Sequence, residues 1–156
     1  MKPESVTIKN LEAAFAGESM AHIKYLYFAK ICRASGDVDS AKVFEETAAQ
    51  EVQHAFGHLD LLFPTAEMTP AKALEMAIAG ETYEYTEMYP QFRHLAEQEG
   101  NSQAVAELDG QIVESKEHAQ RFKDILAKAS KRFAALTKVE ERHANQYRAT
   151  LAKVAA

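Results

Sequence analysis

The sequence predicts an all-α protein, and two observations support that prediction. Apolar residues recur three or four positions apart along most of the 156 residues, which is the spacing of the buried face of an amphipathic helix. The six glycines and four prolines divide the chain into long blocks, as residues that end or restart helices do. Sustained period-two alternation, which would indicate strands, is nearly missing. We therefore expect one helical domain over residues 1–156, long enough to bury a good core.

Composition excludes several classes of function. The net charge of −5 offers no basic face to nucleic acid, and the chain has no apolar run of the roughly 18 residues that a membrane span needs. Cys32 is the only cysteine, so an internal disulfide and a CxxC metal or redox site are excluded. The first five residues lack the apolar segment of a secretory signal. We expect a cytoplasmic protein that binds neither nucleic acid nor a membrane.

The first two helices are expected at about 7–35 and 38–63. Gly36 favours the end of the first helix, because glycine adopts the left-handed backbone that closes a helix. Asp37 or Asp39 can cap the second helix. Both helices carry a core-facing stripe that polar side chains interrupt. The stripes are Leu11, Phe15, Glu18, His22, Tyr25 and Ala29 on the first helix, and Val43, Phe44, Thr47, Glu51, His54, His58 and Leu62 on the second.

A third helix is expected at about 70–99. Thr69 is a capping residue, and Pro70 suits the first helical position. Pro90 lies inside the helix and should kink it just after Met88, because proline removes a backbone hydrogen bond. The stripe of this helix is Leu74, Ala77, Ile78, Glu81, Glu84, Tyr85, Met88, Phe92 and Leu95.

Two further helices are expected at about 102–129 and 131–154. Ser130 is the expected restart between them, although no glycine or proline follows Gly110. The stripe of the last helix is Phe133, Leu136, Glu140, His143, Tyr147 and Leu151.

Carboxylates and imidazoles interrupt these apolar stripes on four of the helices. An unpaired buried charge is costly, so each of these side chains needs a partner. The second and last helices each carry Glu-x-x-His, the first carries a central Glu, and the third carries Glu-x-x-Glu. The residues concerned are Glu18, Glu51, His54, Glu81, Glu84, Glu140 and His143.

This combination is the one that a di-iron or di-manganese carboxylate site in a four-helix bundle requires. Two divalent ions about 3.5–4 Å apart need carboxylates between them and an imidazole or carboxylate at each end. Oxygen donors with imidazoles suit iron or manganese, whereas structural zinc more often recruits thiolates. One Glu-x-x-His alone is more often a solvated helix face. Two such motifs with further glutamates on apolar stripes favour a two-metal site.

Four parts of the chain have a characteristic sequence: Phe15–Met20 with Tyr25–Phe28, Gln50–Leu59, Ala79–Pro90 and Lys138–Ala144. They resemble the ligand helices of the rubrerythrins. The resemblance covers most of residues 8–100 and 131–153, and its Gly-Glu-x-x-Glu-Tyr-Thr-x-Met-Tyr-Pro run is highly specific. It implies a ferritin-like bundle with two iron ions, acting as a peroxidase that reduces hydrogen peroxide to water in oxidative-stress defence.

The resemblance also implies roles for single residues. One iron would be bound by Glu18, Glu51 and either Glu84 or His54. The other would be bound by Glu81, Glu140 and His143, with Glu51 and Glu140 bridging. In the family one iron exchanges a glutamate for a histidine as its oxidation state changes, and Glu84 and His54 match those positions.

Two tyrosines and two histidines lie close to the expected ligands. Tyr25 and Tyr89 match tyrosines that hold carboxylates in orientation, and a role as core aromatics is an equally good interpretation. His22 and His58 each lie one turn from an expected ligand. We interpret them as packing residues, and proton transfer is the alternative role.

The chain departs from the family pattern in its cysteines. Rubrerythrins usually append a rubredoxin-like domain, whose four cysteines are missing here. The rubredoxin-free, sulerythrin-like members are the closer comparison. Electrons would therefore come from a separate donor, such as a rubredoxin-like protein.

A second departure is the extra helix at 102–129, between the third and fourth ligand helices. Counted from Gly100, it lies where the last ligand helix of the family normally lies. Its ligand-like residues are Glu114, Glu117 and His118. The position three before His118 is Ser115, which cannot replace a bridging carboxylate. We therefore prefer Glu140 and His143 and keep the residues of the extra helix as the alternative.

A third departure is the short connection from Phe63 to Thr69. It can reach roughly 20–24 Å. A parallel third helix would need a longer return, because about 18 Å of helix separates Glu51 from Phe63 and about 16 Å separates Pro70 from Glu81. We therefore expect a domain-swapped homodimer, in which the first two helices of one chain complete a site with the third and last helices of the other.

Three rival functions remain open at this stage. A ferroxidase or iron-storage protein would share the bundle and accumulate many irons. An oxygen-reducing oxidase would use manganese or a mixed metal pair in place of two irons. A non-catalytic helical bundle would carry the glutamates and histidines as incidental charge.

Overall fold

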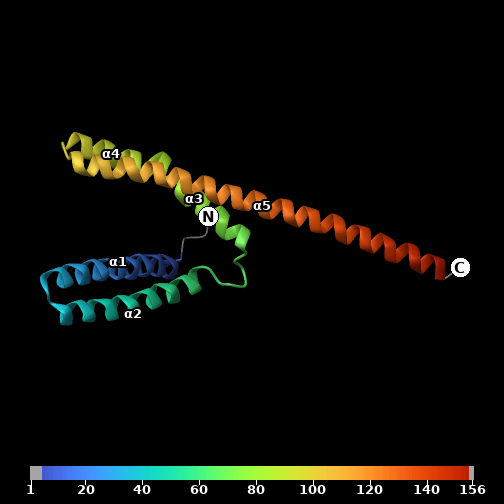
Figure 1. Cartoon of the computed structure of the whole chain (residues 1–156), viewed down its shortest axis with the longest axis horizontal. Coiled ribbons are helices and arrows are strands. Elements are labelled where there is room, and N and C mark those ends of the chain that lie inside the picture. The colour runs from blue at the N-terminus through green and yellow to red at the C-terminus, as the bar shows by residue number, and fades with distance from the viewer. Residues whose placement is uncertain (1–4, 155–156) are drawn as a thin grey trace. The chain divides into compact units, whose positions relative to one another are not determined.

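The computed structural model describes residues 5–154, without the side chains at positions 133, 134, 149 and 152–154. Every regular element in that range is helical, so the all-α prediction is confirmed. The chain divides into two compact units, Met1–Met68 and Thr69–Ala156. The elements, labelled in Figure 1 where there is room, are α1 (Val6–Ser35), α2 (Val38–Leu62), α3 (Pro70–Tyr83), the π-helical turn η1 (Glu84–Met88), α4 (Tyr89–Gln98) and α5 (Ser102–Val154).

The first unit is an antiparallel hairpin of α1 and α2. Gly36 closes α1 with φ +86°, and Asp37 N–H donates to Cys32 O at 2.9 Å, as in a glycine-terminated helix. The Asp37 carboxylate then accepts from Ser40 N–H at 3.0 Å, so Asp37 and not Asp39 caps α2. These two bonds turn the chain within a few residues and explain why both helix boundaries agree closely with the prediction.

Alanines form the seam between α1 and α2. Ala29, Ala41, Ala48 and Ala55 are buried, and the three on α2 are spaced seven residues apart, so they lie along one face. Small side chains let the two helices approach closely. At the turn end of the hairpin, Phe44 packs against the rings of Tyr25 and Phe28.

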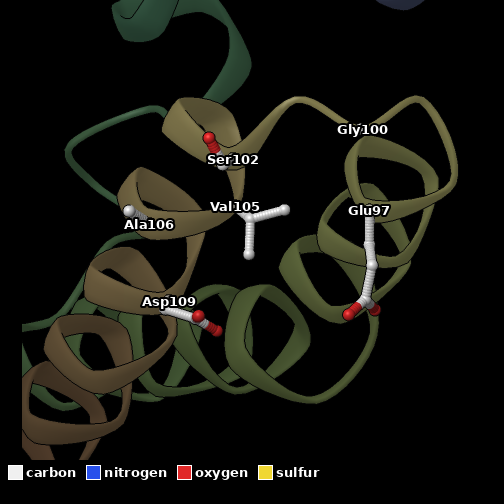
Figure 2. A pocket seen from close by; sticks show the side chains of 6 residues that line it. All are labelled: Glu97, Gly100, Ser102, Val105, Ala106 and Asp109. Carbon is white, nitrogen blue, oxygen red and sulfur yellow. The ribbon is translucent and has the colours of Figure 1, made fainter.

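The second unit folds α5 back along α4, η1 and α3. Gly100 has φ +71°, and the Asn101 side chain caps α5 by accepting from Ala104 N–H at 3.1 Å. Arg93 pairs with Asp109 across the hairpin. A hollow of about 310 Å³ opens beside this turn and contains none of the predicted metal ligands. Figure 2 shows its lining, which is Glu97, Gly100, Ser102, Val105, Ala106 and Asp109.

The third helix does not run unbroken from 70 to 99. Thr69 caps it as expected, accepting from Lys72 N–H at 3.2 Å. A π-helical turn then occupies Glu84–Met88, where Tyr89 N–H donates to Glu84 O. The proline that follows, Pro90, has no N–H to give to the carbonyl four residues earlier, and a wider turn at this place accommodates that loss. The predicted kink is thus a π-helical turn just before the proline.

The predicted restart at Ser130 is wrong. In place of helices at 102–129 and 131–154, the structure has the single helix α5 of 53 residues, about 80 Å long. Ser130 is accommodated inside the helix, where its hydroxyl donates to Leu126 O at 3.0 Å, a bond that helical serines commonly make. No glycine or proline lies beyond Gly110 to interrupt the helix.

The C-terminal half of α5, from about residue 129 to 154, forms its far half. It extends past α3 within the second unit, because residues 70–98 span only about 43 Å. Its apolar side chains are exposed, with Leu136 58%, Tyr147 75% and Leu151 71% accessible. None of the helices in the described range is long and apolar enough to cross a membrane.

Candidate metal centre

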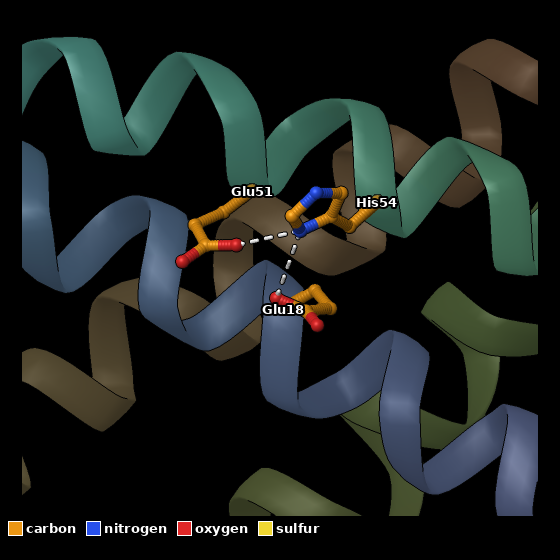
Figure 3. Close-up of side chains that lie close together, drawn as sticks. All are labelled: Glu18, Glu51 and His54. Atoms are coloured by element: carbon orange, nitrogen blue, oxygen red, sulfur yellow. Dashed lines mark hydrogen bonds and ion pairs between the residues drawn. The ribbon is translucent and has the colours of Figure 1, made fainter.

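The first unit brings together Glu18 of α1 with Glu51 and His54 of α2 (Figure 3). Each offers one ligand atom, and these atoms lie within 4.8 Å of one another. His54 Nδ1 is 2.9 Å from Glu51 Oε2 and 3.9 Å from Glu18 Oε2. The positions follow from the helices, since Glu51 and His54 are one turn apart on α2 and Glu18 faces them from α1.

A hydrogen bond between the helices sets the register of this cluster. His22 Nδ1 lies 2.7 Å from Ala48 O, and because a carbonyl only accepts, the ring nitrogen donates. The bond starts one turn after Glu18 and ends one turn before Glu51, so it keeps the two carboxylates opposite each other. This contact agrees with the interpretation of His22 as a packing residue. Tyr25, expected to orient a carboxylate, packs on Phe44 with ring centroids 5.9 Å apart.

Solvent access differs among the three donors. The side chain of Glu51 is 16% exposed, that of Glu18 30% and that of His54 58%. Two carboxylates held together in a partly buried seam repel each other unless a cation or a proton lies between them. Oxygen and imidazole donors at these distances fit a divalent iron or manganese ion.

The second unit brings Glu81 and Glu84 against the near half of α5. His118 Nδ1 is 3.5 Å from Glu81 Oε1, and Ser115 Oγ donates to Glu84 Oε2 at 2.9 Å. The other oxygen of Glu81, Oε2, is buried and has no hydrogen-bond partner among the described residues. A buried carboxylate oxygen without a partner is costly. It is therefore a second place where a metal ion would fit.

Tyr89 lies close to these two carboxylates. Burial raises the pKa of its phenol, and the negative charges of Glu84 and Glu81 raise that pKa further. The phenol therefore keeps its proton at neutral pH and remains a hydrogen-bond donor. This agrees with the expectation that Tyr89 serves the carboxylates, although no hydrogen bond between them is described.

Glu140 and His143 are not brought to Glu81 and Glu84. Both are exposed on the far half of α5, and Glu140 lies about 33 Å along the helix from His118. While His118 lies beside Glu81, a continuous α5 keeps Glu140 out of reach of the same carboxylate in the same chain. Their role as ligands stays a prediction. Glu114 and Glu117, the alternative carboxylates, are exposed.

The sequence contained a signal for the pairing that the structure shows. In an antiparallel hairpin, residues at equal distances from the turn lie opposite each other. Glu81 is 19 positions before Gly100 and His118 is 18 positions after it. Glu84 and Ser115 are 16 before and 15 after. Such a count from the turn predicts both contacts.

The two candidate ligand sets of α5 are related to each other. Ser115-x-x-His118-Ala119 and Glu140-x-x-His143-Ala144 are 25 residues apart, close to seven turns at about 3.6 residues per turn. The same offset relates Phe122 to Tyr147 and Leu126 to Leu151. The two segments therefore present similar residues on one face of α5, and the bridging position is serine in one segment and glutamate in the other.

Fold and site together define an all-α protein whose helices present a carboxylate and histidine cluster that could hold a metal ion. Comparison with known proteins identifies the family of this chain. The family model Rubrerythrin matches residues 9–126. The chain belongs to the rubrerythrin family.

Individual relatives agree with this assignment. Rubrerythrin of Nitratidesulfovibrio vulgaris is 37% identical over 131 residues, covering 77% of this chain and 69% of that protein. Nigerythrin of the same organism is 37% identical over 128 residues, covering 74% and 63%. Rubrerythrin of Porphyromonas gingivalis is 37% identical over 134 residues, covering 79% and 67%. The chain thus spans about two thirds of the length of these relatives.

Among solved structures, fully reduced nigerythrin resembles this chain with a TM-score of 0.41 and 34% identity, over 82% of this chain and 70% of that one. Family membership supports an iron-binding oxidoreductase of oxidative-stress defence with a ferritin-like helical fold. The residues that the family model matches include Ser115 and His118 and end before Glu140.

Proposed function

We propose that this protein is a non-haem di-iron peroxidase, which reduces hydrogen peroxide to water with electrons from a separate donor such as a rubredoxin-like protein. The observation that supports the proposal best is the cluster of Glu18, Glu51 and His54, whose ligand atoms lie within 4.8 Å of one another. The unpartnered buried oxygen of Glu81 adds to it. Membership in the rubrerythrin family supports iron binding as the function of both clusters.

Each unit supplies half of the proposed centre. The first unit would contribute Glu18, Glu51 and His54, with Glu51 as a bridge between two iron ions. The second unit would contribute Glu81 and Glu84. We propose that a second copy of the chain joins the halves in a domain-swapped dimer, because the connection Phe63–Thr69 is short for the return that one chain would need.

Two alternative sets of residues on α5 could supply the remaining ligands. Our prediction from the sequence is Glu140 as the second bridge and His143 as a terminal ligand, which a continuous α5 allows only if another copy of the chain is involved. The alternative is His118, which the 3.5 Å contact with Glu81 favours. In the alternative, Ser115 occupies the bridging position and Glu51 is the only bridging carboxylate.

Bound iron would supply two electrons for cleavage of the peroxide O–O bond, and two protons complete the formation of two waters. The carboxylates give the ions their counter-charge. His54, the most exposed of the three donors in the first unit, would be the ligand that exchanges with Glu84. Tyr89, whose pKa is raised, keeps its proton and could donate a hydrogen bond to one of the neighbouring carboxylates or to the peroxide substrate.

A stopped-flow experiment tests the peroxidase assignment. Protein reduced and loaded with iron under argon is mixed with hydrogen peroxide in one run and with dissolved oxygen in another. We expect peroxide to oxidise the iron faster. Faster oxidation by oxygen would favour the ferroxidase or oxidase, and uptake of many irons for each chain would favour iron storage.

A further inference from the structure

We infer that Ser115 is a positioning residue that holds one oxygen of Glu84, so that the other oxygen is the one directed toward a bound metal ion. This inference rests on the proposed function, because it takes Glu84 to be a ligand. Ser115 is not one of the expected ligands. In the expected ligand set, the residue three positions before the histidine is a bridging glutamate.

The burial of Ser115 sets it apart. It is 3% exposed, and it is the only polar side chain classed as buried in the described part of the chain. Its hydroxyl crosses from α5 to η1 and donates to Glu84 Oε2 at 2.9 Å. A buried hydroxyl that donates to a carboxylate makes a charge-assisted bond, which is stronger than a bond between neutral groups.

Other serines and threonines of the helices use their hydroxyls differently. Ser19, Thr82 and Ser130 each donate to the backbone carbonyl four residues earlier in their own helix, which is the usual choice of a helical hydroxyl. Ser115 instead donates to a side chain 31 residues away. The bond therefore fixes the direction of Glu84 in a way that local helix geometry does not.

The bond limits how Glu84 can bind metal. An ionised carboxylate has two oxygens that can bind one ion together, bridge two ions or bind singly. With one lone pair of Oε2 occupied by the Ser115 hydroxyl and its direction fixed, Oε1 is the oxygen that is left without a described hydrogen bond and can bind an ion first. The matching residue of the related segment is Glu140. A glutamate in place of Ser115 would add a third carboxylate beside Glu81 and Glu84. Serine thus orients a ligand without adding negative charge.

Cobalt(II) provides a direct probe, because its visible absorption reports the number and kind of its ligands. The full-length wild-type protein is titrated with cobalt(II) beside Ser115→Ala, Ser115→Thr and Ser130→Ala. Ser130→Ala is the matched control, since it also removes a serine hydroxyl from α5 but only a bond to a backbone carbonyl.

We expect Ser115→Ala to shift the cobalt absorption bands and to weaken cobalt binding about 10-fold, the lower range for losing a residue that orients a ligand. Ser115→Thr should restore the wild-type spectrum, and Ser130→Ala should leave it unchanged. In a Glu84→Gln background, Ser115→Ala should have no further effect on the spectrum, because Ser115 acts through Glu84.

Three results would overturn the inference. Spectra and affinities for Ser115→Ala equal to those of the wild type would show that the hydroxyl does not position a ligand. Equal losses in Ser115→Ala and Ser115→Thr would assign the serine to packing. A wild-type protein that binds no cobalt would overturn both this inference and the proposed function, whereas the first two results would leave the metal site intact.

Discussion

At the scale of single residues, the positions of four side chains favour one part of α5 as the contributor to the proposed metal centre. His118 lies 3.5 Å from Glu81, and Ser115 bonds to Glu84. The sequence offered two histidines at equivalent positions on one helical face, and spacing within the helix cannot choose between them. The choice depends on which segment of α5 lies opposite Glu81, a tertiary contact that the hairpin turn at Gly100 determines.

Single histidine substitutions separate the two ligand sets. If His118 is the ligand, His118→Ala should lose one iron for each chain, because one ion loses its only α5 donor, while His143→Ala should retain two. Iron content measured by plasma emission after anaerobic reconstitution gives the answer. The opposite result would assign Glu140 and His143 to the centre and would require another copy of the chain to supply them.

Asp37 makes a pH-dependent contribution to stability. Hydrogen bonds from Ser40, through its side chain first and its backbone N–H second, lower the pKa of the Asp37 carboxyl below its ordinary value of 3.8. A lowered folded pKa means that the stabilisation is present above the unfolded pKa and is lost as the pH falls through the folded pKa.

Thermal unfolding of Asp37→Ala should therefore show a lower Tm than the wild type at neutral pH. The difference should shrink as the pH falls below 3.8. Asp39→Ala, two residues further into α2, is the control and should change the Tm little. A difference that stays constant down to about pH 2 would contradict the role of the ionised cap.

At the scale of helices, the sequence predicted the first unit better than the second. The α1–α2 boundary was predictable because Gly36 and Asp37 are local signals with a direct backbone consequence. The continuity of α5 through Ser130 was not predicted, because a serine hydroxyl can either cap a new helix or bond within an existing one. The π-helical turn before Pro90 was expected only as a kink, since a missing N–H shows where a helix is disturbed but not how the backbone adjusts.

The alanine seam of α2 gives a stability test at this scale. Ala48 is fully buried between α1 and α2, so Ala48→Leu would overpack the seam and should lower the free energy of unfolding by about 1–3 kcal/mol. Ala49→Leu, at the next and exposed position, should change it little. Urea unfolding followed by circular dichroism measures both, and equal stability of the two variants would show that the helices do not pack closely at Ala48.

At the scale of the whole molecule, each compact unit carries part of the proposed ligand set. Helical periodicity shows which face of a helix is buried, but it cannot show which copy of the chain covers that face. The short connection Phe63–Thr69 is the only local signal for exchange between chains. The apolar side chains exposed on the far half of α5 are also those that a partner chain would cover.

Complementation between two defective chains tests the swapped dimer. Glu51→Ala disables the first unit and Glu81→Ala disables the second, so neither variant alone should bind a pair of irons. In a swapped heterodimer, one site draws both of its halves from intact units, so co-expression of the two variants should restore about a quarter of the wild-type site content. No recovery, in a heterodimer verified by mass spectrometry, would show that each chain builds its own centre.

The central claim is that carboxylates and histidines from both units enclose two iron ions. Mössbauer spectroscopy of the protein reconstituted with iron under argon, together with its iron content, tests this claim most directly. We predict two irons for each chain, which form an antiferromagnetically coupled pair after oxidation, and loss of that pair in Glu51→Ala. A wild-type protein that binds no iron, or that holds only isolated uncoupled ions, would contradict it.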